Sequence, residues 1–138
     1  ERLLRQAVEI QFGDSVWLKR LSAGSQRDIG AVYIDAKAKG VETTPLECTT
    51  ITHLKEILMG DGSWIREVGY GSRDAFKRSM DRIIGWRNTV VHSRAMVRSS
   101  EGGKNLHKIV NELGTQVQQL RKWLQESFAS LVRNGDYQ

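Results

Sequence analysis

A regular apolar stripe near the end of the chain is the feature that most limits its fold. From residue 104 onward, apolar side chains recur at steps of mostly three and four, at Leu106, Val110, Leu113, Val117, Leu120, Leu124, Phe128 and Leu131. This spacing predicts one long amphipathic helix with a face that must be covered. Earlier segments also present single apolar stripes, so we favour packing within one bundle over a coiled-coil dimer.

The rest of the chain also favours helices. Its 138 residues contain one proline, Pro45, so nothing else strictly forbids long helices. This length suits one domain, residues 1–138, with a core that needs neither disulfide nor metal. We predict an all-α bundle of four to five helices with a long C-terminal helix. The start at Glu1 and the polar end suggest a fragment of a longer protein with further domains.

Glycines and capping residues divide the chain before this stripe. We expect helical segments over residues 1–12, 15–21, 26–39, 51–60, 64–68 and 72–91. Gly13 and Gly40 should end the segments before them, and Thr49 or Thr50 and Ser72 should cap those that follow. Loops are expected at residues 22–25, 61–63 and 99–103, which are rich in Gly and Ser.

Several classes of function are disfavoured by the composition. One cysteine, Cys48, cannot form an internal disulfide, and beside three scattered histidines it makes no zinc site. No apolar run is long enough to cross a bilayer, and residues 1–5 do not begin a signal peptide. The glycine-bearing segments lack a phosphate-loop pattern. We therefore expect a cytoplasmic protein that needs no membrane, metal or cofactor.

Positive charge gathers in one segment. The chain has a net charge of +5 and a pI near 9.6. Between residues 72 and 98, seven cations face two anions, and 7 − 2 = +5 equals the whole excess. The cations are Arg73, Lys77, Arg78, Arg82, Arg87, Arg94 and Arg98. This pattern fits either a solvated helix face or a surface for a polyanion.

Arg87 stands in an unexpected place on this basic helix. At about 100° per residue, it lies roughly 20° from Phe76, inside the apolar face formed with Met80 and Ile83. Burying an unpaired charge costs several kcal/mol, on the order of a domain's whole stability margin. Arg87 must therefore pair with an internal acid or carbonyl, or lie where the apolar face opens into a groove or interface.

Helix geometry restricts how Arg87 can share a site with its polar neighbours. Asn88 and His92 are four residues apart and share one side of a helix, whereas Arg87 and His92 lie about 140° apart on a straight helix. A site that uses both therefore requires a bend near Val91 or a second copy of the chain. His53 and His107 are interpreted as capping or surface residues, because neither has a recognisable partner in the sequence.

The segment Trp86-Arg87-Asn88-Thr89-Val90-Val91-His92-Ser93 resembles the signature of HEPN domains, in which Arg, a polar residue, a short apolar stretch and His occur late in a helical bundle. Upstream segments look like the Swt1-type HEPN family, so the resemblance covers most of residues 1–95. It implies a HEPN-like bundle that often forms homodimers. In many members it also implies metal-independent endoribonuclease activity, as in toxin or antiviral defence systems.

The resemblance assigns roles to particular residues. His92 would move protons during attack of a ribose 2′-hydroxyl on phosphate, Arg87 would stabilise the developing charge, and Asn88 would orient His92 or a phosphate oxygen. Arg82, Arg94 and Arg98 would hold the RNA backbone. The alternative is a non-catalytic HEPN module for dimerisation, partner recruitment or RNA binding. A DNA-binding domain ranks lower, because no helix-turn-helix pattern stands out.

Overall fold

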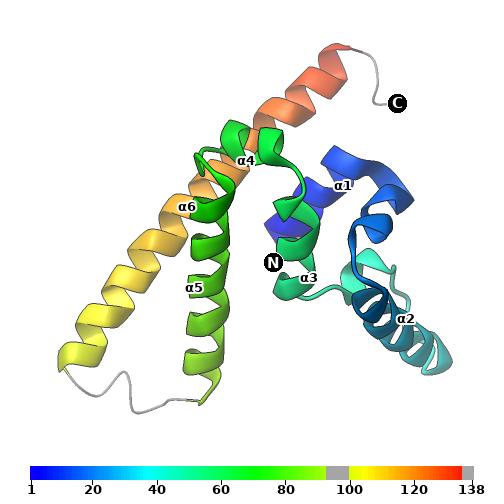
Figure 1. The fold of residues 1–138 in the computed structure, drawn as a ribbon, viewed down its shortest axis with the longest axis horizontal. Coiled ribbons are helices and arrows are strands. Elements are labelled where there is room, and N and C mark those ends of the chain that lie inside the picture. The colour runs from blue at the N-terminus through cyan, green and yellow to red at the C-terminus, as the bar shows by residue number, and fades with distance from the viewer. Residues whose placement is uncertain (93–99, 135–138) are drawn as a thin grey trace.

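The computed structural model describes residues 1–92 and 100–134, and at residues 14, 15, 89–92 and 100–105 it describes the backbone alone. Its described part is all-helical, which confirms the predicted class and the long C-terminal helix (Figure 1). The elements are α1 (Arg2–Val16), η1 (Trp17–Arg20), α2 (Ala23–Ala38), η2 (Leu46–Cys48), α3 (Ile51–Met59), α4 (Gly62–Val68), α5 (Arg73–His92) and α6 (Ser100–Arg133).

Two predicted helix ends are confirmed by their backbone angles. Gly13 has φ 71° and ψ −166°, a non-helical conformation that breaks α1 near its end. Gly40 has φ 74° and follows α2. Both angles lie in the left-handed half of backbone space, where a residue with a Cβ atom is strained. Glycine therefore stops each run for a local steric reason, and the sequence alone revealed it.

The predicted loop at residues 22–25 is wrong, because α2 begins at Ala23. The Ser22 hydroxyl accepts the N–H of Ser25, which caps the first turn. Glu56 on α3 adds to this cap by accepting the Ser22 N–H at 2.7 Å and the Ser25 hydroxyl at 3.0 Å. A carboxylate from another helix thus satisfies donors at this helix start.

The break at residues 61–63 is shorter than predicted. Asp61 accepts the N–H of Trp64 at 3.0 Å, so α4 starts at Gly62. α4 is the helical segment predicted at residues 64–68, and it is one of six α-helices in the described part.

Residues 100–103, also predicted as loop, lie within α6. Two interior glycines cost a helix roughly 1 kcal/mol each but do not block it.

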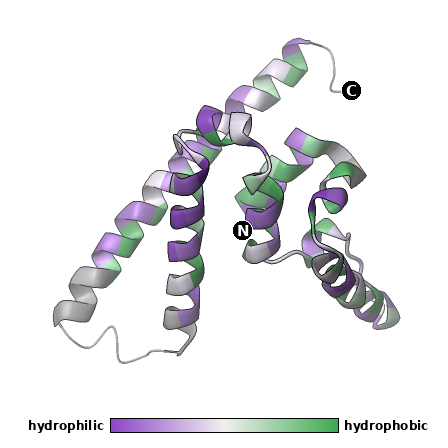
Figure 2. Ribbon diagram, viewed as in Figure 1, coloured by the Kyte–Doolittle hydropathy of each residue, from purple (hydrophilic) through white to green (hydrophobic). Residues whose placement is uncertain are grey.

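The hydrophobic core centres on α3, which contacts α1, α4 and α5. Leu54, Ile57 and Leu58 on α3 are completely buried. A cluster of aromatic rings extends this core toward α6, with Trp64 at 5.7 Å from Phe76 and 6.0 Å from Trp123 between ring centroids. Hydrophilic residues predominate on the visible face of α5 (Figure 2). The core therefore holds α5 by one side and leaves its other side to solvent.

Packing of α6 covers a line of residues that overlaps the predicted stripe only in part. The buried positions on α6 are Ile109, Gln116, Leu120 and Trp123. Val110 and Phe128, which belong to the predicted stripe, are 57% and 48% exposed. At about 100° per residue the buried line is rotated by roughly 70° from the stripe centre. The bundle thus covers one edge of the apolar face, and the other edge stays at the surface.

Candidate nucleic-acid interface around Arg87

The basic helix α5 is positioned by a cap at its start and by apolar residues along one side. The Ser72 hydroxyl accepts the N–H of Ala75 at 3.1 Å, as expected for a capping serine. Phe76 and Met80 are buried, and Ile83 is partly buried against the same core. The predicted core-facing side is therefore confirmed over the first half of α5. The side chains of Val90 and Val91 lie outside the described residues.

Arg87 lies where this apolar side opens to solvent. Its side chain is 52% exposed, and its Nη1 atom is 2.8 Å from Oε1 of Glu1. Figure 1 shows the first residue between α3 and α5, which brings Glu1 to the helix. Arg87 therefore has an internal acidic partner, as the first alternative requires, and its side chain is half-exposed rather than buried.

Glu1 joins Arg87 to a second arginine. The other carboxylate oxygen of Glu1, Oε2, accepts a hydrogen bond from Arg5 on α1 at 3.2 Å. Arg5 in turn donates to the backbone oxygen of Thr49 at 2.6 Å and to its hydroxyl at 3.3 Å. Thr49 is only 3% exposed. The surface cluster of Glu1, Arg5 and Arg87, which we call the double-arginine cluster, is thus attached to the protein interior.

Asn88 and His92 occupy other angular positions on the α5 backbone than Arg87. Asn88 is exposed, and α5 continues as one α-helix to His92. Helical geometry keeps Arg87 and His92 about 140° apart along such a helix. The position of the His92 imidazole lies outside the described residues. The α5 backbone is helical through His92, so the described helix has no break that would bring these two positions onto one side.

The proposed RNA-contacting cations divide into two groups. Arg82 lies 2.6–2.7 Å from Oε1 of Glu112 on α6, so it cross-links the two helices. Arg94 and Arg98 lie outside the described residues.

Other cations on α5 lie at the surface. Arg73, Lys77 and Arg78 are exposed and form no ion pair within the described ranges. These three residues give α5 its positive surface.

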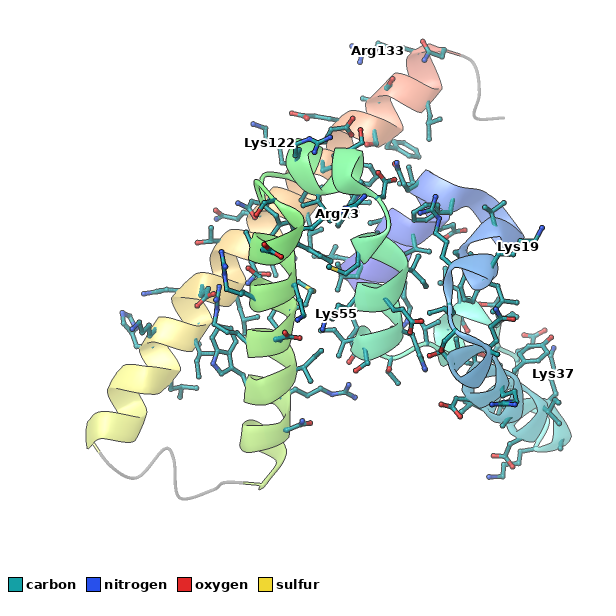
Figure 3. The ribbon with its side chains drawn as sticks, in the orientation of Figure 1. Lys19, Lys37, Lys55, Arg73, Lys122 and Arg133 are labelled. Carbon is teal, nitrogen blue, oxygen red and sulfur yellow. The ribbon has the colours of Figure 1, made fainter. Side chains whose placement is uncertain are left out.

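An ion pair between α3 and α5 borders the interface. Lys55 on α3 contacts Asp81 on α5 at 2.5 Å, and Figure 3 shows Lys55 in the space between the two helices. The hydrogen bond from Lys55 lowers the pKa of Asp81 below its ordinary value. Asp81 therefore stays ionised at neutral pH, and Lys55 neutralises the one acidic group on this part of α5.

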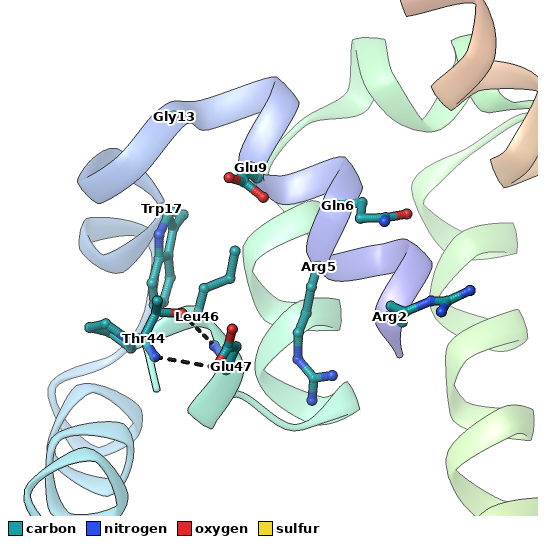
Figure 4. Close-up of a pocket in the computed structure, with 10 residues that line it drawn as sticks. Arg2, Arg5, Gln6, Glu9, Gly13, Trp17, Thr44, Leu46 and Glu47 are labelled. Carbon is teal, nitrogen blue, oxygen red and sulfur yellow. Dashed lines mark hydrogen bonds between the residues drawn. The ribbon is translucent and has the colours of Figure 1, made fainter. Parts of the chain in front are cut away.

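A pocket of about 360 Å³ lies beside α1, close to the double-arginine cluster. Figure 4 shows Trp17 and Glu47 on one side of it and Arg5 on the other. Arg5 thus belongs to the pocket wall and to the contact with Glu1. The sequence analysis missed Arg5 and Glu1, because only the fold brings the start of α1 to Arg87.

His53 has the capping role expected from its position. Its Nδ1 atom accepts the N–H of Thr50 at 3.0 Å at the start of α3. His107 is exposed on α6.

Neither metal-binding clusters, nor membrane-spanning helices, nor known protein families help to assign a function to this site. Among the residues that the structure describes, no cluster of three or more His, Cys, Asp or Glu side chains could hold a metal ion. In the same ranges, no helix has the length and apolar character needed to cross a bilayer. The chain matches no protein-family model, and comparison with curated proteins and with solved structures gives no match either.

Proposed function

We propose that this chain is a HEPN-type, metal-independent endoribonuclease domain that binds the RNA backbone through Arg87. The observation that carries the proposal is a half-exposed arginine in the apolar line of the most basic helix. An exposed ion pair contributes about 0.2–1 kcal/mol to stability, which is too little to account for a cation at that position. A guanidinium that reaches solvent can instead hold phosphate oxygens in a bidentate manner.

The proposed reaction follows from the side chains on the last turns of α5. His92 accepts the proton of a ribose 2′-hydroxyl, and the 2′-oxygen forms a bond to the adjacent phosphorus. The bond from phosphorus to the 5′-oxygen of the next nucleotide breaks, and that oxygen takes up a proton. Imidazole groups exchange protons near neutral pH, as this step requires. Arg87 stabilises the charge that develops on the phosphate oxygens.

A second copy of the chain completes the site in this proposal. Because α5 is continuous to His92, Arg87 and His92 of one copy diverge by about 140°. Arg87 from one copy and His92 from the other would meet on the same phosphate. The partners are therefore RNA and a second copy, and we expect the domain to act in the cytoplasm.

RNA cleavage in the presence of EDTA tests the proposal. Single-stranded RNA is incubated with wild-type protein, His92→Ala and His107→Ala. His107 is an exposed histidine on α6 and provides the matched control. Wild type and His107→Ala should cleave, whereas His92→Ala should lose at least about a hundredfold in rate. Equal cleavage by His92→Ala, or none by concentrated wild type, would contradict the proposal.

A non-catalytic HEPN module is the second candidate. It is favoured by the contact between Arg87 and Glu1, which ties α5 to the start of α1. This candidate assigns Arg87 to stability, so Arg87→Ala should lower the melting temperature strongly or change the elution volume on a sizing column.

A further inference from the structure

The double-arginine cluster has an arrangement found in none of the other ion pairs of the described residues. Lys55 with Asp81 and Arg82 with Glu112 each join one cation to one carboxylate. In the cluster, two guanidinium groups share a single carboxylate, with Oε1 of Glu1 on Arg87 and Oε2 on Arg5. Two positive charges against one negative charge leave an excess of +1.

We propose that Arg5 and Arg87 form a clamp for one phosphodiester group of RNA, and that Glu1 occupies this clamp when RNA is absent. The proposal rests on the proposed function for its ligand, and it adds Arg5 as a binding residue and Glu1 as an internal competitor. Guanidinium groups bind carboxylates and phosphates with the same planar pairs of N–H donors.

The exchange of the two anions conserves charge. A phosphodiester and a carboxylate each carry one negative charge, so the two arginines together with the anion they bind have a net charge of +1 before and after RNA binds, and the displaced Glu1 carboxylate turns to solvent. The exchange therefore leaves no additional unpaired charge in a partly buried place, which would be costly.

The two arginines differ in how firmly they are held. Arg5 keeps its bonds to the backbone oxygen and hydroxyl of Thr49 when Glu1 leaves, and its side chain is 25% exposed. Arg87 is 52% exposed and contacts Glu1 where the core-facing side of α5 opens to solvent. One arginine is therefore positioned in advance, which reduces the entropy lost on binding, and the other remains accessible to a large ligand.

Glu1 can leave without disruption of the helix that follows it. A side-chain rotation of Glu1 breaks its contacts to Arg5 and Arg87 and leaves its backbone oxygen on the N–H of Arg5 at 3.0 Å. Such surface contacts are weak, and RNA can therefore compete for them.

Binding of an uncleavable RNA tests the clamp separately from catalysis. The probe is a fluorescein-labelled, single-stranded 2′-O-methyl RNA, which lacks the attacking hydroxyl, and the readout is fluorescence anisotropy. Glu1→Gln should lower Kd by roughly five- to tenfold, since it weakens two competing contacts. Glu9→Gln is the matched control, because it makes the same charge change at an exposed position on α1. It should shift Kd less than twofold.

A second set of variants in the same binding experiment removes either arginine. Arg5→Gln should weaken binding to about the same extent as Arg87→Gln, and the double variant Glu1→Gln/Arg5→Gln should lose the gain of Glu1→Gln. Circular dichroism melts of each variant show whether it is folded. If Arg5→Gln fails to fold, Arg5→Lys keeps the charge but removes the planar fork, and it should still bind several-fold more weakly than wild type.

The outcomes separate the clamp from the ribonuclease. If Glu1→Gln binds no more tightly than Glu9→Gln, or if folded Arg5 variants bind like wild type, the clamp is overturned even where wild type cleaves RNA. If Glu1→Gln tightens binding but wild type cleaves nothing, the clamp stands and the ribonuclease fails. Absence of RNA binding by wild type and Glu1→Gln overturns the clamp as well.

Discussion

Replacement of Arg87 by alanine tests whether this residue serves the fold or a ligand. Its side chain is 52% exposed and that of its partner Glu1 is 29% exposed, so the contact is screened by solvent. Pairs of this kind contribute about 0.2–1 kcal/mol. Glu1 keeps its contact to Arg5 at 3.2 Å, so the substitution does not isolate its carboxylate. We therefore expect Arg87→Ala to lower the free energy of unfolding by at most about 1 kcal/mol.

The measurement is urea unfolding followed by far-ultraviolet circular dichroism, with a thermal melt alongside. A loss of about 1 kcal/mol should lower the melting temperature by about 3–5 °C for a chain of this size. Phe76→Ala, on the same helix and with a completely buried side chain, is the reference for the loss of unfolding free energy when a structural residue is removed. It should lose about 3–5 kcal/mol, because it leaves a cavity in the core.

Comparison of the two variants decides the role of Arg87. A loss for Arg87→Ala that approaches the loss for Phe76→Ala would refute our reasoning and assign Arg87 to the structure. High salt should also reduce the effect of Arg87→Ala, whereas Phe76→Ala should be insensitive to salt.

Three further substitutions test other parts of the structure. Gly13→Ala should lower the free energy of unfolding by about 1–3 kcal/mol in urea titrations, since φ 71° with ψ −166° strains any residue with a Cβ atom, and an unchanged midpoint would contradict this backbone geometry. Tyr70→Phe should cost about 1–3 kcal/mol, because the Tyr70 hydroxyl donates to buried Gln116 at 3.1 Å, and wild-type stability would show that this bond contributes nothing. Asp81→Asn tests the pair with Lys55, whose hydrogen bond lowers the pKa of Asp81 from the ordinary 3.8. The stabilisation it brings should be complete above pH 3.8 and be lost as the pH falls through the lower folded-state pKa. The difference in unfolding free energy between wild type and Asp81→Asn should therefore shrink in acid, and a difference that stays constant with pH would refute the pairing.

The spread of exposed cations along α5 fits the proposed RNA ligand better than it fits a small anion. One side of α5 packs toward α3 and α4, Arg82 ties the helix to Glu112 on α6, and exposed cations lie elsewhere along it (Figures 1 and 3). Arg73 and Lys77 near its start and Arg87 near its end are separated by several helical turns. A backbone with repeated phosphates can contact such separated charges together, whereas a single small anion cannot.

Local signals in the sequence determined much of the fold. Gly13 and Gly40 end their helical runs because their positive φ angles suit glycine alone. Ser72 caps α5 with its hydroxyl oxygen, and at the start of α3 the N–H of Thr50 is accepted by Nδ1 of His53. The spacing of apolar residues was sufficient to predict the all-α class, the extent of α5 and the long last helix. These features depend on neighbours within one or two helical turns, which a sequence displays directly.

Tertiary structure alone decided the features that depend on distant residues. The start of α2 uses Glu56 from α3, and the buried line of α6 follows the shape of the bundle rather than the centre of its own apolar stripe. The pattern on α5 revealed Arg87 as a charge in need of a partner. Only the fold could supply Glu1 as that partner and place Arg5 on the same carboxylate, because these contacts depend on how α1 is placed beside α5, and this placement is set by the shared core around α3.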